Sequence, residues 1–400
     1  MTPSAIPHGA YWCTPFARWQ GSLSHLHSLR FAAHVAREAL ATRGLAAEIF
    51  DYGVLGMTVP QRNCFYGLPW LAGELGAPQI GGPTIMQACA TSARVIAHAD
   101  DEIRAGRAER VLAITADRVS NGPHIYYPNP RGPGGTGETE DWVLGNFESD
   151  PFARCNMLST AENCARQWRV STTEQHELVL RRYAQYQDAL RDHGGQTFQQ
   201  RYMALPFAVP DQQFRKTLLT LATDEGIHPT TADGLSRLKA ITQDGTITYG
   251  GQTHPADGNA GMVITSAAAA PDLAQDPKIR IRLVAIAQAR AAVAMMPAAP
   301  IDAARRALAV AGVTIHDLAA IKSHNPFAVN DIIFARETGA DLAQMNNYGC
   351  SLIWGHPQGP TGMRAIIELI EELVEKGGGW GLFHGCAAGD TAMAVVLKVE

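Results

Sequence analysis

Two cysteines and one histidine stand in short motifs of the kind that places a reactive side chain at the end of a strand. Cys89 lies in the run QACATSA, Cys386 in HGCAAGD near the other end of the chain, and His356 in GHPQGPTG between them. A thiol nucleophile, an imidazole base and a second thiol are the groups that acyl transfer through a thioester requires. The sequence therefore predicts this chemistry, provided that the three groups meet in the fold.

Each candidate also has an inert interpretation. A cysteine directly before a helix has free backbone N–H groups and the positive end of the helix dipole beside it, which favour a thiolate and can hold an oxyanion. Cys89 has that setting, although a single cysteine taken alone is more often buried and unreactive. His356 is either the base that activates the thiol or a surface histidine in a glycine-rich turn. His324 follows a predicted strand and can project beside the same groups.

The elements that would position these residues occur twice in the chain. After Cys89, apolar residues recur at helical spacing and lead, past a glycine, into an apolar run over 111–114 that predicts a buried strand. The same order follows Gly362, with a helix over 366–374, a glycine stop and a strand over 380–383. Two copies of this unit predict an α/β protein in which helices cover parallel or mixed sheets.

The middle of the chain lacks the repeated helix and strand pattern. Residues 121–245 begin with proline- and glycine-rich sequence and continue into a polar helical stretch over 160–190, with no third copy of the unit. Insertions of this length in a compact protein are often lids or binding loops. Further buried strands are predicted over 279–287, 318–322 and 391–399.

Composition and charge narrow the classes of function. The chain has 400 residues, of which 46% are hydrophobic and 18% charged, and its formal net charge is -5 without any block of lysine or arginine. Nothing therefore favours a nucleic-acid partner. No export signal and no membrane-length apolar window are found, so we expect no membrane association and a cytoplasmic location. There the seven cysteines would be reduced thiols, and no zinc-ligand spacing predicts a metal site.

Taken in order, the motifs resemble those of the thiolase family. The family pattern is a cysteine nucleophile in the first half, an Asn- or His-Glu-Ala-Phe motif, Gly-His-Pro-x-Gly-x-(Ser/Thr)-Gly-x-Arg, and a Cys-x-Gly motif near the end. The matching segments here are Cys89, His324 to Phe327, Gly355 to Arg364, and Cys386 to Ala388. The resemblance covers nearly the whole chain and implies two similar α/β halves stacked as five layers, with an inserted loop domain.

The resemblance also implies a division of the chain and a set of partners. The N-terminal half would span 1–120, completed by about 246–270, and the C-terminal half 271–400. The loop domain would span 121–245 and cover the CoA site. Acyl-CoA and CoA would be substrates, with no tightly bound cofactor. Because family members are dimers or dimers of dimers, a homodimer or homotetramer is expected.

Catalytic roles are carried over residue by residue. Cys89 would attack the carbonyl of an acyl-CoA or 3-ketoacyl-CoA, and His356 would take its proton and so form a reactive ion pair. Cys386 would move the proton at the α-carbon of the second acyl-CoA. One oxyanion hole would use His356 and a water held by His324, and the other the backbone N–H groups of Cys89 and Ala388.

Positions that contact CoA or the acyl group are implied in the same way. They fall on Asn156, Met157, His228, Thr253 and Phe327. Where the family typically has a histidine, an arginine and a serine, this chain has Asn156, His228 and Thr253, so fewer cations face the expected nucleotide end. These departures concern acyl-chain preference and CoA affinity more than reaction class.

The resulting hypothesis is an acyl-CoA C-acyltransferase that makes or cleaves a 3-ketoacyl-CoA through an acyl-Cys89 intermediate, in fatty-acid or aromatic-acid metabolism. A decarboxylating condensing enzyme shares the fold but normally has histidine in place of the second cysteine, so Cys386 argues against it. A non-catalytic acyl-CoA-binding relative, or a subunit active only with a small partner protein, remains an alternative.

Overall fold

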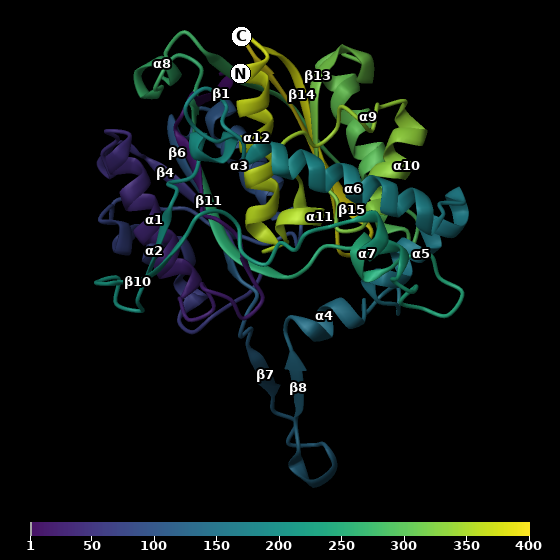
Figure 1. Ribbon diagram of the computed structural model, residues 1–400. Helices are drawn as coiled ribbons and strands as arrows, with labels where there is room; N and C mark the ends of the chain where they lie inside the picture. The colour runs from purple at the N-terminus through teal and green to yellow at the C-terminus, as the bar shows by residue number, and fades with distance from the viewer. Residues whose placement is uncertain (1) are drawn as a thin grey trace.

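Two half-sheets meet at the first strand of the chain. The computed structural model describes residues 2–400 (Figure 1). Its strand β1 (Ser4–Pro7) pairs antiparallel with both β11 (Ala256–Ser266) and β12 (Arg280–Arg290), which joins the half-sheets edge to edge. The continuous sheet has the order β13-β14-β15-β12-β1-β11-β6-β4-β5, with parallel and antiparallel neighbours. The predicted mixed α/β architecture is confirmed.

The other strands of this sheet divide between the two halves. The first half holds β2 (Tyr11–Cys13), β3 (Ala17–Arg18), β4 (Tyr52–Gly56), β5 (Thr84–Ile85) and β6 (Arg110–Arg118). The second half holds β13 (Leu318–His324), β14 (Gly379–Ala387) and β15 (Thr391–Val399). Each of the strands predicted from apolar runs is present, because such runs are typical of strands buried on both faces.

Helices complete five layers. Helices α1 (Ser28–Thr42) and α2 (Gly67–Leu75) cover one face of the first half-sheet, and α9 (Ala299–Ala311) covers the second, with α10 (Ala328–Thr338) beside it. Between the half-sheets lie α3 (Thr91–Arg104) and α12 (Gly359–Glu375), which also contact each other. Central placement explains why the side chains of α12 are buried from its first residue to Leu373.

The repeated unit predicted from the sequence is present in both halves. Helix α3 leads into β6 and helix α12 leads into β14. Gly106 and Gly377 follow the helix ends with φ of 69° and 80°, the left-handed conformation that glycine adopts without steric penalty. The two reactive segments therefore enter equivalent helices of the central layer.

The segment between β6 and β11 carries most of the irregular structure. Its hairpin of β7 (His124–Tyr127) and β8 (Glu138–Asp141) projects away from the layers (Figure 1). The polar stretch predicted to be helical over 160–190 consists of two helices. Arg169 adopts a left-handed φ of 54°, and the capping box of Ser171 and Glu174 then starts the second helix.

The remaining elements are short or belong to this segment. They are α4 (Leu144–Glu148), α5 (Met157–Trp168), α6 (Thr172–Ala189), β9 (Phe207–Pro210), β10 (Thr217–Leu221), α7 (Ala232–Ser236), α8 (Ala270–Leu273) and α11 (Ser351–Trp354), with 3-10 turns at Ala47–Ile49, Cys64–Tyr66, Pro133–Gly135, Phe198–Arg201, Tyr249–Gly251, Met296–Ala298 and Ile315–Asp317. Among residues 2–400, no helix combines the length and the apolar character that crossing a membrane requires.

Candidate active site

Cys89 stands in a tight turn that leads from β5 into α3. Ala88, just before it, has a positive φ of 43°, and the N–H of Thr91 bonds back to the carbonyl of Ala88 at 3.1 Å. Such a conformation is unfavourable for a non-glycine residue and persists only where the surroundings hold it. The N–H groups of Ala388 and of Cys89 itself remain available and hydrogen-bond the thiol. The turn thus presents the thiol of a half-buried cysteine with two backbone donors beside it.

His356 is held in a loop that only glycine can precede. Gly355 has a φ of 93°, and a Cβ atom there would lie 2.8 Å from the ring of His254 and 3.0 Å from Ala256. The N–H of His356 donates to the carbonyl of His254 at 2.9 Å. Its Nδ1 lies 2.6 Å from the Oγ1 of Thr361 in the first turn of α12. The ring is therefore oriented by contacts to its backbone and to Nδ1, and Nε2 faces outward.

Three of the predicted catalytic residues, Cys89, His356 and His324, lie together. Nε2 of His356 lies 3.1 Å from Sγ of Cys89. The ring of His324 stacks on that of His356, with centroids 4.1 Å apart and 26° between the planes. Its Nδ1 lies 3.0 Å from Oγ of Ser351, while its Nε2 is buried and finds no partner within residues 2–400. Donor atoms of all three residues lie within 4.8 Å of one another.

Burial is the main cause of the pKa shifts in this group. It raises the pKa of Cys89 to about 12, although the N–H groups of Ala388 and Cys89 act in the opposite direction. Burial, with smaller effects of His324 and His254, lowers the pKa of His356 well below its ordinary value. Burial and His384 lower the pKa of His324 to about 3. In all three residues, burial therefore favours the neutral form.

Cys386 lies close to this group but under cover. It stands near the end of β14, is fully buried, and its thiol accepts a hydrogen bond from Nδ2 of Asn330 at 3.3 Å. Burial raises its pKa well above the ordinary value, and a charge on Cys89 raises it further, which places the two thiols near each other. Cys386 does not line the cavity described next, whereas Ala388, two residues later, does.

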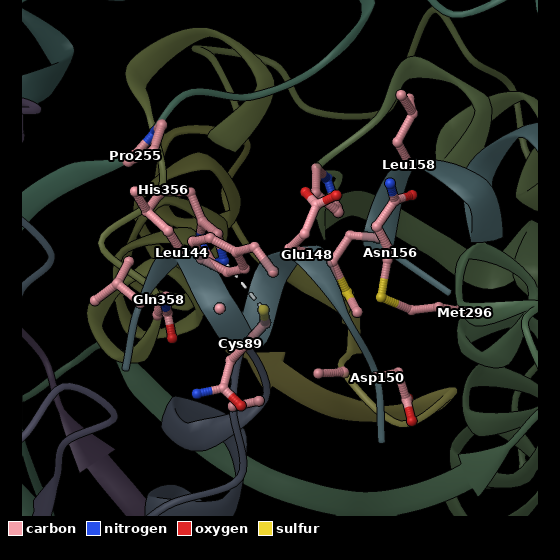
Figure 2. A pocket seen from close by; sticks show the side chains of 18 of the residues that line it. Cys89, Leu144, Glu148, Asp150, Asn156, Leu158, Pro255, Met296, His356 and Gln358 are labelled. Carbon is pink, nitrogen blue, oxygen red and sulfur yellow. Dashed lines mark hydrogen bonds between the residues drawn. The ribbon is translucent and has the colours of Figure 1, made fainter. Parts of the chain in front are cut away.

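A cavity of about 1190 Å³ opens over Cys89 (Figure 2). His356 joins Cys89 in its lining, and His324 lies behind His356. His228 is exposed and lies outside the lining, so the structure does not bring this predicted contact to the cavity. Four other predicted contacts do line it, namely Asn156, Met157, Thr253 and Phe327.

The charges of the cavity lining have one sign. Glu140, Glu148 and Asp150 contribute carboxylates, and the described residues that line the cavity include neither lysine nor arginine. Figure 2 shows Glu148 and Asp150 near Asn156 and Met296, on the other side of the view from the pair of Cys89 and His356.

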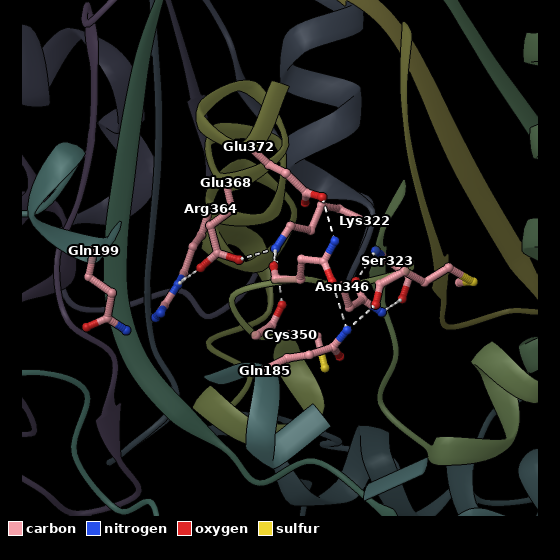
Figure 3. A network of polar contacts seen from close by, with 12 residues as sticks. Gln185, Gln199, Lys322, Ser323, Asn346, Cys350, Arg364, Glu368 and Glu372 are labelled. Carbon is pink, nitrogen blue, oxygen red and sulfur yellow. Dashed lines mark hydrogen bonds and ion pairs between the residues drawn. The ribbon is translucent and has the colours of Figure 1, made fainter. Parts of the chain in front are cut away.

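A second buried polar cluster lies along α12 (Figure 3). Arg364 donates to both carboxylate oxygens of Asp224 at 2.5 and 2.9 Å and to Glu368 at 3.0 Å. Glu368 also accepts from Lys322 at 3.2 Å and from Tyr202 at 2.8 Å. The charged side chains are 0–1% exposed. Because buried charges require such partners, this network fixes α12 against β13 and the loop of Asp224.

Several supporting residues were not singled out from the sequence. Thr361 and Ser351 contact the two imidazoles through Nδ1, and Asn330 contacts Cys386. Asp117 accepts the N–H of Gly359 at 2.8 Å and so holds the start of α12. Thr361 lies inside the Gly-His-Pro motif and could have been found there. The others carry no signal, because their partners are distant in sequence.

Comparisons with known proteins agree with this geometry. The family model described as "Thiolase, N-terminal domain" matches residues 10–268, and "Thiolase, C-terminal domain" matches residues 277–399. The chain is 29% identical to an acetyl-CoA acetyltransferase of Pseudomonas aeruginosa, over 96% of each protein. It is 26% identical to a 3-ketoacyl-CoA thiolase of Bacillus subtilis, over 100% of each.

Similarity in three dimensions extends over the same length. The structure of human mitochondrial 3-ketoacyl-CoA thiolase superposes with a TM-score of 0.89 at 24% identity, covering 100% of this chain and 99% of that one. The same human enzyme in complex with CoA superposes with a TM-score of 0.87 at 24% identity, covering 100% and 98%. At this identity the likeness concerns the fold, and it supports the five-layer arrangement.

Proposed function

This chain belongs to the thiolase family, and we propose that Cys89 is the cysteine on which it carries the acyl group. The protein is an acyltransferase that makes or cleaves a 3-ketoacyl-CoA through an acyl-cysteine intermediate. One observation supports the choice of Cys89 above all others: Nε2 of His356 lies 3.1 Å from its sulfur, and both residues line the large cavity.

Acylation uses the neutral pair. In the cleavage direction, Sγ of Cys89 bonds to the 3-keto carbon as its proton passes to Nε2 of His356. This requires the Nδ1 proton of His356 to point at Thr361, 2.6 Å away. The bond between the second and third carbons then breaks, and its electron pair leaves on the enolate of the shortened acyl-CoA. The N–H groups of Cys89 and Ala388 are placed to stabilise the tetrahedral oxyanion.

The second thiol completes the exchange. Cys386 protonates the departing enolate carbon, and in the condensing direction its thiolate removes the α-proton of the incoming acyl-CoA. CoA then attacks the acyl-cysteine as the Cys386 thiolate takes the CoA proton, and Cys89 leaves as a thiolate that regains its proton from His356. His324 has an unpartnered Nε2 beside His356, and a water that donates to this nitrogen would direct its other O–H to the thioester oxygen of the enolate.

The cavity favours an apolar acyl group. Met157, Leu158 and Met296 line it together with Phe327, and the acyl chain would pack on these side chains. We propose CoA thioesters as the substrates, with CoA as a substrate and not as a resident cofactor. The human relative crystallised with CoA supports binding of CoA by this fold. The carboxylates of the lining disfavour an acyl chain that ends in an anion.

The oligomeric state and the cellular location of the protein are proposed from the family resemblance and from the sequence. We propose a homodimer or homotetramer, and the projecting hairpin supports this because Tyr126 and Tyr127 are 53% and 48% exposed on it. A small accessory subunit remains compatible with the same surface. Each of the seven cysteines is a free thiol, which supports function in a reducing cytoplasm.

The test is CoA-dependent cleavage by the purified chain alone. Acetoacetyl-CoA and longer or aryl 3-ketoacyl-CoAs would be mixed with CoA, and acyl-CoA products and the acyl-enzyme would be followed by mass spectrometry. We expect two acyl-CoA products from one 3-ketoacyl-CoA and an adduct on the peptide that contains Cys89. Binding without turnover would support the non-catalytic alternative. Turnover only after addition of a small partner protein would support the subunit alternative.

A further inference from the structure

The catalytic group has the composition of a metal site as well as that of a thiolase centre. One thiol and two imidazoles converge within 4.8 Å from three segments far apart in sequence. We propose that Cys89, His324 and His356 bind a thiophilic divalent cation such as Zn²⁺, and that the bound cation reversibly blocks the nucleophile. The sequence showed no zinc-ligand spacing because each donor comes from a separate element.

The hydrogen bonds of the two imidazoles engage Nδ1 and leave Nε2 available to a cation. Nδ1 of each imidazole is engaged by a hydroxyl, of Ser351 for His324 and of Thr361 for His356. The Ser351 hydroxyl can in turn donate to Oδ1 of Asn325 at 3.0 Å. Nδ1 of His324 then carries the proton, and the lone pair of its Nε2 is free. Metal-binding histidines characteristically have the second nitrogen held in this way.

The buried Nε2 of His324 is the independent sign of a ligand. The His324 side chain is 1% exposed, and its Nε2 finds no partner within the described residues although it borders the reactive pair. Buried polar atoms are normally satisfied, so an unpartnered nitrogen here points to something that binds. In the proposed reaction that partner is transient. A cation would satisfy the same nitrogen permanently.

The donor types are those that zinc prefers. Zinc bonds thiolate sulfur at roughly 2.3 Å and imidazole nitrogen at roughly 2.0–2.1 Å, in tetrahedral sites. At these bond lengths a tetrahedral angle places sulfur and nitrogen roughly 3.5 Å apart. Sγ of Cys89 and Nε2 of His356 are 3.1 Å apart and would separate slightly around one ion. The rings of His324 and His356 stack with centroids 4.1 Å apart and 26° between their planes, so the His324 ring must turn out of this stack to aim its Nε2 at the same ion. The fourth position faces the cavity that Cys89 and His356 line, where water can enter.

Binding has a definite chemical consequence. The Cys89 thiol releases its proton to solvent, and its sulfur forms a bond to the cation, so the electron pair needed for attack on a thioester is occupied. Acylation of Cys89 in turn removes the sulfur ligand. Cation and acyl group therefore exclude each other. The inhibition rests on the proposed function, whereas the binding does not.

The experiment measures binding directly, by titrating the purified chain, freed of metal, with Co²⁺ and with Zn²⁺. We expect one Co²⁺ per chain, with a thiolate-to-cobalt charge-transfer band and the visible bands of a tetrahedral site, and we expect Zn²⁺ to displace it. Cys89→Ser should remove the charge-transfer band, and His324→Phe, which keeps a stacked ring, should weaken Zn²⁺ binding at least 10-fold. Thr361→Val should weaken it roughly 10- to 100-fold, as outer-shell changes do.

Controls separate this site from adventitious binding. Cys155 is the other cysteine that is not fully buried, so Cys155→Ser should bind the cation like the unaltered chain. In the unaltered chain, Zn²⁺ should protect Cys89 from alkylation, as measured by peptide mass spectrometry, and prior alkylation should abolish the cobalt band. This pair of measurements needs no substituted protein and so does not depend on a variant folding.

Two results would overturn the proposal. One is equal Zn²⁺ affinity in the unaltered chain, Cys89→Ser and His324→Phe. The other is alkylation of Cys89 at the same rate with and without Zn²⁺. If the cobalt band forms but the chain cleaves no 3-ketoacyl-CoA, the metal site stands and the proposed function fails. If cleavage occurs without a cobalt band, the function stands and the site fails.

Discussion

Two buried polar clusters lie along α12, one at its start and one further along the helix. They differ in how many of their polar atoms have hydrogen-bond or ion-pair partners. The network of Arg364, Asp224, Glu368 and Lys322 pairs every charge with an opposite charge and adds further hydrogen bonds from neighbouring groups. The catalytic group of Cys89, His324 and His356 carries no such pairing, and one ring nitrogen has no partner.

This difference indicates that the charged network has a structural role and the group of Cys89, His324 and His356 a catalytic one. A fully buried charged side chain is tolerated only when it has an opposite charge and hydrogen-bond partners. The network is therefore rigid, and breaking it lowers the free energy of unfolding. Neutral thiol and imidazole groups can be buried even when some of their donor and acceptor atoms have no hydrogen-bond partner. Those unpartnered atoms are the ones that bind the substrate. Changes in the network should therefore alter stability, and changes in the catalytic group should alter turnover at nearly constant stability.

The largest effect is expected for Cys89→Ser. A serine hydroxyl at the same place is a much weaker nucleophile beside a base of low pKa, so kcat should fall roughly 10⁴-fold or more. The acyl-enzyme should disappear from mass spectra, and the melting temperature should stay close to that of Cys155→Ser. A persisting adduct on another residue would remove Cys89 from its role.

Cys386→Ala tests whether the second thiol belongs to the same reactive cluster. Acylation of Cys89 should continue, whereas condensation should slow by roughly 10²- to 10⁴-fold, the usual contribution of a general acid or base. Single-turnover acylation and steady-state condensation would be measured on one preparation. Normal condensation by the variant would show that another group moves the α-proton.

Arg364→Met should break the supporting cluster. It leaves Asp224 and Glu368 buried without their cation, which destabilises a protein by about 3–5 kcal/mol. Denaturant unfolding would measure this against Arg237→Met, whose ion pair with Asp233 is 76% and 75% exposed. Exposed pairs contribute about 0–1 kcal/mol. Equal losses in the two variants would mean that burial does not distinguish them.

His324→Ala should lower kcat roughly 10²- to 10³-fold, as removal of one oxyanion donor does, and should change KM less. His384→Ala is a matched control, because His384 is also buried, has two unpartnered ring nitrogens and stacks on Phe334 with centroids 3.7 Å apart. Both variants lose a buried ring. Only the loss of His324 should affect kcat strongly, and a pure KM effect would make His324 a binding residue.

The smallest effect is expected for Thr361→Val, which keeps the shape of the side chain and removes the partner of Nδ1 in His356. A hydrogen bond of this kind contributes about 0.5–1.5 kcal/mol, so we expect up to about a 10-fold loss of kcat. Thr361→Ser, which keeps the hydroxyl, should restore most of it. Failure of serine to restore activity would assign the loss to packing.

Much of this arrangement was predictable from local sequence. The helix and strand after Cys89 and their counterparts after Gly362 follow from apolar spacing and glycine stops, which act within a few residues. The break at Arg169 was missed because a left-handed residue other than glycine leaves little sequence signal. His228 was placed at the cavity by motif order, yet it is exposed outside it, since loop paths depend on long-range packing.

By itself, the sequence determined the reactive residue types, their order and the elements that carry them, because propensity and side-chain chemistry are local properties. Only the tertiary structure decided that the thiol and two imidazoles meet, that burial favours their neutral forms, and that Cys386 lies covered beside them. Those facts depend on distances and burial between segments hundreds of residues apart. Desolvation and contact are properties of the packed chain, and no short stretch of sequence contains them.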